Sequence, residues 1–300
     1  MAPAAGQSRT AQGVFASVLS SFGFATMDAA TKGVLGTVSP SLALVLRTVL
    51  LLGGTIAWIL LMRRQNMFRT TAIGGTVLRS VAFGFTSLLI VVSMKYLSLA
   101  ETMAIYFLNP VLAVPLASVL LREPAGRWAV PATLLGFTGV LCVIQPSVEG
   151  FRWAYLIPLA AAFSGAFHDV MSRKLKGHAA PLTLMMYGMM ASLAWGLVTM
   201  DWSRMATPGT REWGLLMLAA GVGFIANFFV IVSFQLAPAS LSAPLRYLLL
   251  AWSALIGWMV WNQLPNFWGW VGIALILAAG LLAIASSLNP RETAAVAEGV

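Results

Sequence analysis

The feature of this sequence that most constrains its fold is a series of ten apolar stretches separated by short polar junctions. Each stretch is close to the roughly 20 residues that a helix needs to cross the hydrocarbon core of a bilayer. A transmembrane β-barrel would instead show alternating segments of about ten residues, and the sequence lacks them. The sequence therefore predicts an all-α membrane protein with ten transmembrane helices. These helices are expected at residues 12–35, 40–62, 72–95, 100–120, 127–145, 152–174, 180–200, 212–235, 239–261 and 266–288.

The composition excludes the main classes of soluble protein. Apolar residues make up 59% of the 300 residues and charged residues 9%, against about 45–50% and 25% in ordinary soluble domains. The single cysteine, Cys142, and the lack of low-complexity tracts exclude disulfide-rich, collagen-like and disordered chains. The net charge of +9 comes from Lys and Arg beside apolar helices. We interpret it as a topology signal, and we expect no nucleic-acid partner.

Lys and Arg residues are distributed unevenly between the two sides of the predicted bundle. Of the 18 in the chain, ten flank the side that holds both termini, five flank the other side and three lie inside the apolar stretches. Cytoplasmic loops of membrane proteins carry the excess of positive charge. We therefore expect both termini in the cytoplasm and the chain in a bacterial inner (plasma) membrane. The first stretch is interpreted as a retained helix rather than a cleaved signal, and residues 289–300 as a cytoplasmic tail.

An internal repeat relates the two halves of the chain at an offset of about 141 residues. Residues 21–28 align with 162–169, so that Asp28 matches Asp169, and prolines near the ends of stretches also match. Each copy holds five predicted helices, an odd number, so the second copy enters the membrane in the opposite orientation. Such inverted repeats recur in secondary transporters that work by alternating access. We expect two five-helix halves, residues 1–145 and 146–288.

Several local features accompany the repeat. They are Arg47 early in the second stretch, Glu123-Pro124 after the fourth, a Gly-rich fifth stretch, Pro244-Leu245-Arg246-Tyr247, and Leu264-Pro265. With the two five-helix halves, these features resemble the EamA-type transporters of the drug/metabolite transporter superfamily. Leu264 departs from the pattern, because family members often carry an acidic residue there. The resemblance implies a transporter that exports small metabolites, among which amino acids are prominent.

Six ionisable residues fall inside the predicted helices. They are Asp28, Arg47, Arg79, His168, Asp169 and Arg246. Such a residue costs about 2.5–3.5 kcal/mol to insert, so it usually faces the bundle interior. We hypothesise two ion-pair layers that close alternately as gates, Asp28 with Arg47 near the outer face, and Asp169 with Arg79 or Arg246 near the inner face. The alternative is that these pairs are static and only neutralise each other.

A further set of polar and aromatic residues is a candidate binding surface. Its members are Tyr106, Asn109, Asn227, Tyr247 and Trp252. Pro110 and Pro115 follow Asn109 and are expected to loosen that helix, because proline removes a backbone donor. With the charged residues, this set suits a small zwitterion with an apolar side chain. For each aromatic residue, the alternative is packing in the core or at the membrane interface.

Two patterns in the sequence resemble signatures of catalysis or of cofactor binding but have simpler interpretations. His168 and Asp169 are neighbours whose side chains leave a helix about 100° apart, so we expect no dyad between them. The pattern Gly221-Val-Gly223-Phe-Ile-Ala226 resembles a dinucleotide-binding turn but lies in an apolar helix, and we interpret it as a packing face. The sequence lacks a phosphate-binding loop. We therefore expect a transporter rather than an enzyme, without cofactor, metal or catalytic residues and driven by a gradient.

Three alternatives remain at this point. The same fold could carry a nucleoside-like metabolite, a sugar phosphate or a cationic drug. The chain could be an intramembrane lipid-modifying enzyme, although His168 is the only intramembrane histidine. A channel is disfavoured because no ring of like charges is visible. The expected partners are a small-molecule substrate and the lipid bilayer. The sequence leaves open proton coupling and the oligomeric state, with a monomer as the working expectation.

Overall fold

The computed structural model describes residues 5–61, 69–121, 129–144, 152–204, 207–236, 245 and 247–287, and over these residues the fold is all helical. The first half contains α1 (Ala5–Val34), α2 (Pro40–Leu61), α3 (Ile73–Tyr96), α4 (Leu99–Tyr106), α5 (Asn109–Leu120) and α6 (Ala129–Ile144). The second half contains η1 (Trp153–Tyr155), α7 (Leu156–Lys174), α8 (Pro181–Thr199), η2 (Trp202–Arg204), α9 (Thr210–Leu236), α11 (Leu248–Trp261) and α12 (Phe267–Ser287). Within the described ranges, β pairing is limited to an isolated bridge between Thr70 and Ala179.

Each predicted apolar stretch overlaps helical structure. Seven helices are long and apolar enough to cross a membrane, with α4 and α5 counted together, and three shorter apolar helices lie within α6, α11 and α12. The count of ten crossings therefore stays a prediction. The fourth stretch is broken between Tyr106 and Asn109. Pro110 explains this break, because a proline ring clashes with the carbonyl four residues earlier, which here belongs to Tyr106.

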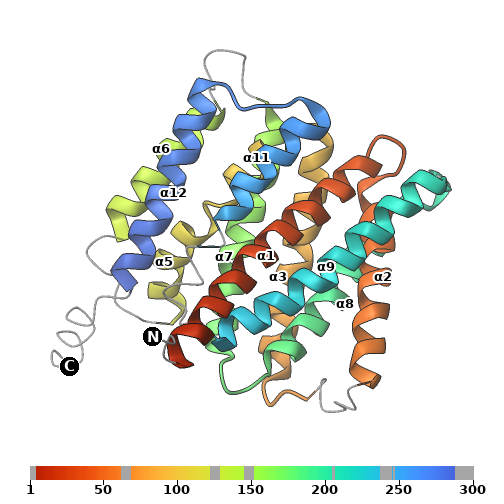
Figure 1. Cartoon of the computed structure of the whole chain (residues 1–300), viewed down its shortest axis with the longest axis horizontal. Coiled ribbons are helices and arrows are strands. Elements are labelled where there is room, and N and C mark those ends of the chain that lie inside the picture. Colours follow the sequence, from red (N-terminus) through yellow and green to blue (C-terminus); the bar gives the residue numbers. More distant parts are fainter. Residues whose placement is uncertain are drawn as a thin grey trace.

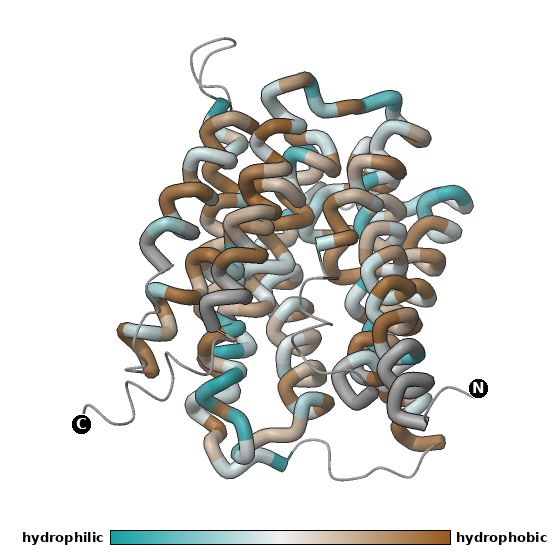
Figure 2. The backbone as a smooth tube through the Cα atoms, turned by 60° about the vertical axis from the view of Figure 1, so that its left-hand side comes forward, coloured by the Kyte–Doolittle hydropathy of each residue, from teal (hydrophilic) through white to brown (hydrophobic). Residues whose placement is uncertain are grey.

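The surface of the bundle is apolar where a soluble protein would be polar. Figure 2 shows apolar residues along the middle of the helices, with hydrophilic residues concentrated toward the two ends. Large apolar side chains are exposed on several helices, among them Leu61, Val119 and Val198. Exposed apolar area of this extent marks a membrane or protein contact. This observation supports the prediction of an integral membrane protein.

The bundle has two ends, which we name for what lies there. At the terminal end, α1 begins and α12 ends (Figure 1). The connections before α3 and after α7 also meet at this end, where the Thr71 amide donates to the His178 carbonyl at 3.0 Å. At the opposite end, α1 ends and α2 begins. Asp28 therefore lies on α1 toward the opposite end of the bundle, and Asp169 lies on α7 toward its terminal end.

The helix pairing is consistent with the repeat. The offset of 141 residues makes α7 the counterpart of α1, and α9 the counterpart of α3. In the structure α1 packs on α9, and α3 packs on α7. Likewise α2 packs on its counterpart α8, and α6 packs on its counterpart α12. These pairings are those that an exchange of the two halves would preserve.

The glycine pattern in α9 belongs to the α1–α9 contact. A Cβ on Gly223 would lie 2.7 Å from Met27 Sδ, and a Cβ on Gly23 would lie 2.9 Å from the Ala226 Cβ. Small residues let the two helices approach closely. The prediction that residues 221–226 form a packing face is confirmed for Gly223 and Ala226. A Cβ on Gly221 would meet no atom within 4 Å in the described part of the chain.

Candidate functional site

The first polar cluster joins α1 to α2. Arg47 Nη1 lies 3.6 Å from Asp28 Oδ1, and each side chain is 9% exposed. The same nitrogen donates a hydrogen bond to Thr31 Oγ1 at 3.1 Å, and that hydroxyl donates to the Met27 carbonyl at 2.8 Å. The predicted contact between Asp28 and Arg47 is confirmed. The role of this pair as a gate stays a prediction.

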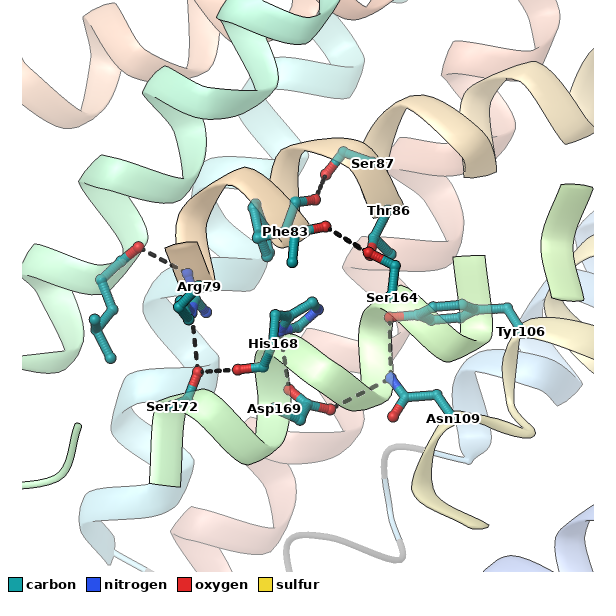
Figure 3. A network of polar contacts seen from close by, with 12 residues as sticks. Arg79, Phe83, Thr86, Ser87, Tyr106, Asn109, Ser164, His168, Asp169 and Ser172 are labelled. Carbon is teal, nitrogen blue, oxygen red and sulfur yellow. Dashed lines mark hydrogen bonds and ion pairs between the residues drawn. The ribbon is translucent and has the colours of Figure 1, made fainter. Parts of the chain in front are cut away.

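The second polar cluster surrounds α7 (Figure 3). Arg79 Nε donates to Ser172 Oγ at 2.9 Å, and Arg79 Nη1 donates to the Leu184 carbonyl at 2.9 Å. Asp169 Oδ2 instead accepts from Asn109 Nδ2 at 3.3 Å. The predicted direct pair of Arg79 with Asp169 is therefore wrong, because uncharged acceptors on α7 and α8 bind the guanidinium. The alternative partner of Asp169, Arg246, lies outside the described residues.

The side chains of His168 and Asp169 approach each other, but the expectation of no dyad between them is not overturned. His168 Nδ1 lies 3.3 Å from Asp169 Oδ1, although the two residues are neighbours on α7. His168 Nδ1 makes no hydrogen bond to the carboxylate, so this approach is an ion pair only when the imidazole is protonated. Phe83 of α3 packs edge-on against the imidazole, with the ring centroids 5.3 Å apart. The Arg79 guanidinium lies over the same Phe83 ring at 5.0 Å.

Asn109 reaches Asp169 because α5 begins beside a glycine of α7. A Cβ on Gly165 would lie 2.7 Å from Asn109 Nδ2 and 3.1 Å from Tyr106 Cε2. The Asn109 amide also lies 3.4 Å from the Tyr106 hydroxyl, to which it donates. Gly165 thus leaves the space that these two side chains occupy. The second cluster brings together five of the predicted site residues, namely Arg79, Tyr106, Asn109, His168 and Asp169.

The other predicted site residues have different neighbours. Asn227 on α9 donates to the Gly223 carbonyl of its own helix at 2.8 Å. The Tyr247 ring packs against Phe107 with centroids 5.1 Å apart, and Trp252 on α11 packs edge-on against Phe22 of α1 at 5.3 Å. These contacts fit the packing alternative for the aromatic residues. Substrate binding by Asn227, Tyr247 and Trp252 stays a prediction.

A set of polar contacts at the opposite end was not expected from the sequence. Lys32 Nζ donates to the Leu97 carbonyl at 2.5 Å and to the Met94 carbonyl at 3.3 Å. The Tyr155 hydroxyl donates to Glu101 Oε1 at 3.2 Å. Glu101 also forms a capping box with Ser98 at the start of α4. The Ser-x-x-Glu spacing of a capping box is readable from the sequence, whereas the partners of Lys32 depend on how α1 packs against α3.

Comparison with known proteins gives the family. The profile of the EamA-like transporter family matches residues 11–145 and 152–285. This chain belongs to the EamA-like transporter family. The resemblance inferred from the residues is therefore confirmed, and the EamA-like profile matches once in each predicted half.

Curated relatives of this EamA-like protein carry several transporter names. A riboflavin transporter of Vibrio cholerae is 30% identical over 59% of this chain and 59% of its own length. The pseudopaline exporter of Pseudomonas aeruginosa (strain UCBPP-PA14) is 24% identical over 94% of this chain and 96% of its own length. The S-adenosylmethionine uptake transporter of Rickettsia prowazekii is 28% identical over 74% of this chain and 75% of its own length.

The extent of these matches differs. The chain spans about three fifths of the length of the Vibrio riboflavin transporter, and 63% of a Rhizobium johnstonii riboflavin transporter. A solved crystal structure at 21% identity superposes with a TM-score of 0.62, covering 95% of this chain and 98% of that chain. At this identity the superposition establishes the fold alone.

Proposed function

We propose that this EamA-like protein is a secondary transporter that carries a small metabolite across the bacterial inner membrane by alternating access. Its two units are the five-helix halves at residues 1–145 and 146–288. The observation that carries the proposal is the pair of polar clusters on equivalent helices. Asp28 on α1 is buried in an ion pair toward the opposite end, whereas the Asp169 side chain on α7 is 38% exposed toward the terminal end. This difference is expected when one gate is closed and the other open.

The substrate class follows from the second cluster and from the family. A cation, a carboxylate, an amide and aromatic rings lie together around Asp169. This set supports an amino acid, the class that the family resemblance implies. A second candidate is a nucleoside-like or other heteroaromatic metabolite, which the names of the riboflavin and S-adenosylmethionine transporters favour. The excess of Lys and Arg on the side of the termini supports cytoplasmic termini, and the resemblance supports export.

The test is efflux from proteoliposomes that contain the purified full-length chain. The liposomes are preloaded with radiolabelled amino acids or, in parallel, with adenosine and riboflavin, with and without an imposed proton gradient. We expect saturable efflux that empty liposomes lack, and at least a tenfold loss of this efflux in Asp169→Asn. Absence of flux for every compound, with protein that is folded by circular dichroism, would overturn the transport proposal.

The same assay addresses coupling. A proton-driven exchanger would respond to the imposed gradient, whereas a facilitator would not. Loss of that response in Asp28→Asn or Asp169→Asn would identify the carboxylate that carries the proton.

A further inference from the structure

We propose that Asp169, positioned by the Asn109 amide, binds an ammonium group, so that the transported compound is an organic amine. This inference rests on the transport function proposed above and names its substrate class. It separates amino acids and S-adenosylmethionine, which carry an ammonium group, from riboflavin and adenosine, which do not.

The two halves, aligned at the offset of 141 residues, differ in which arginine contacts the equivalent hydroxyl. Thr31 and Ser172 occupy equivalent positions, and each hydroxyl donates to the carbonyl four residues earlier and accepts from an arginine. In the first half that arginine is Arg47, which also contacts Asp28. The equivalent of Arg47 in the second half is Gly188.

In the second half Arg79 donates to the Ser172 hydroxyl instead, and it reaches this hydroxyl from α3 rather than from α8. A Cβ on Gly188 would lie 3.1 Å from Arg79 Nη1. From α3, the guanidinium reaches Ser172 and the Leu184 carbonyl. Its charge still acts on Asp169 electrostatically, yet no ion pair within 4.0 Å joins them. The carboxylate of the first half is therefore neutralised by direct contact with an arginine, whereas Asp169 contacts no arginine among the described residues and has His168 Nδ1 3.3 Å from its Oδ1.

The Asp169 side chain is more exposed than that of its counterpart Asp28. Its side chain is 38% exposed, whereas that of Asp28 is 9% exposed. A carboxylate is too costly to leave against hydrocarbon. The exposed part of Asp169 therefore faces water or a ligand.

The hydrogen-bonding groups around Asp169 determine which chemical group can bind there. Asn109 is buried, and its Nδ2 donates to Asp169 Oδ2, which holds the carboxylate in place. The amide orientation is fixed by Asp169, because exchanging its O and N would place two oxygens against each other. The exposed part of the Asp169 carboxylate is an acceptor and carries a negative charge, so the ligand must donate. An ammonium group brings three N–H donors and a positive charge, and the neighbouring Tyr106 ring suits an adjacent apolar body.

The test measures binding without transport. Isothermal titration of the full-length protein in nanodiscs compares phenethylamine with its neutral analogue 2-phenylethanol. We expect the amine to bind at least tenfold more tightly than the alcohol in the parent, and Asp169→Asn to abolish this difference. Glu212→Gln removes one negative charge near the start of α9, and we expect it to bind as the parent does. Equal affinity for the two probes in the parent would overturn the proposal.

Two further variants keep the result interpretable. Gly165→Ala retains every charge but displaces Asn109, and we expect it to weaken amine binding at least fivefold with little change for the alcohol. Arg246→Gln tests the rival partner of Asp169. We expect the preference for the amine over the alcohol to persist in this variant, and its loss would overturn the proposal, because the selectivity would then depend on Arg246 rather than on Asp169.

The binding assay and the flux assay test different claims. Amine-selective binding without flux would contradict the transport function but not the ammonium site. Flux without amine-selective binding would contradict only the ammonium site.

Discussion

At the scale of single residues, the main energetic feature is the ion pair of Asp28 and Arg47 inside an apolar bundle. Each buried charge is neutralised by the other. Both side chains are 9% exposed, and the guanidinium has Thr31 as a further acceptor. A buried ion pair need not stabilise a fold relative to apolar residues. Removal of one partner, however, leaves an uncompensated charge and costs about 3–5 kcal/mol.

Arg47→Met is therefore expected to lower the free energy of unfolding by about 3–5 kcal/mol. Combining Asp28→Asn with Arg47→Met removes both charges and is expected to recover most of this loss. Thermal unfolding of both purified variants in detergent measures the difference. If Arg47→Met folds, unfolds at the parent temperature and transports like the parent, the pair is neither a gate nor a structural necessity.

At the scale of helices, close contacts are decided by where glycines face each other. A Cβ on Gly139 of α6 would lie 2.8 Å from the Gly272 carbonyl oxygen, and a Cβ on Gly272 of α12 would lie 2.5 Å from the Gly139 carbonyl oxygen. The obstructing atoms are backbone, which cannot rotate away. The α6–α12 contact therefore requires glycine at both positions.

Gly272→Ala is expected to reduce stability by about 1–3 kcal/mol through overpacking, although alanine favours a helix more than glycine does. Gly221→Ala is the matched control, because its added Cβ would meet no atom within 4 Å among the described residues. The control is expected to be neutral or to stabilise by up to about 1 kcal/mol. Unfolding in a series of SDS concentrations compares the two. Equal stability of both variants would show that α6 and α12 separate without cost.

At the scale of the whole molecule, polar contacts tie the opposite end together. Lys32 joins the end of α1 to the end of α3, and Tyr155 joins η1 to Glu101 of α4. Arg152 also donates to the Tyr96 carbonyl at 2.9 Å. Under alternating access, these ties stabilise the state that is closed at this end.

Lys32→Met is expected to shift the population toward the state open at the opposite end. The reporter is Thr102→Cys in a Cys142→Ala background, because Thr102 on α4 is fully buried. We expect maleimide to label this cysteine about threefold faster in Lys32→Met than in the parent. Lys32→Arg retains the charge and is expected to label at the parent rate. An unchanged rate in Lys32→Met would contradict a role for Lys32 in closing this end.

Much of the architecture could be predicted from the sequence, because the apolar stretches follow from the length and chemistry of a bilayer. The break before Asn109 follows from the chemistry of Pro110. The contact of Asp28 with Arg47 was also predictable, because a buried charge needs a partner and these two were expected at the same depth in neighbouring helices.

The partners in the second cluster were decided by the tertiary structure. Arg79 could have paired with Asp169, but Ser172 and the Leu184 carbonyl bind its guanidinium, and Gly165 lets Asn109 reach the carboxylate instead. His168 lies near Asp169, and Phe83 of α3 packs edge-on against its ring. The sequence by itself determined which segments are apolar helices and which charges they bury. Only the packing decided which acceptor each charge meets, because that choice depends on distances of a few ångströms between helices far apart in the chain.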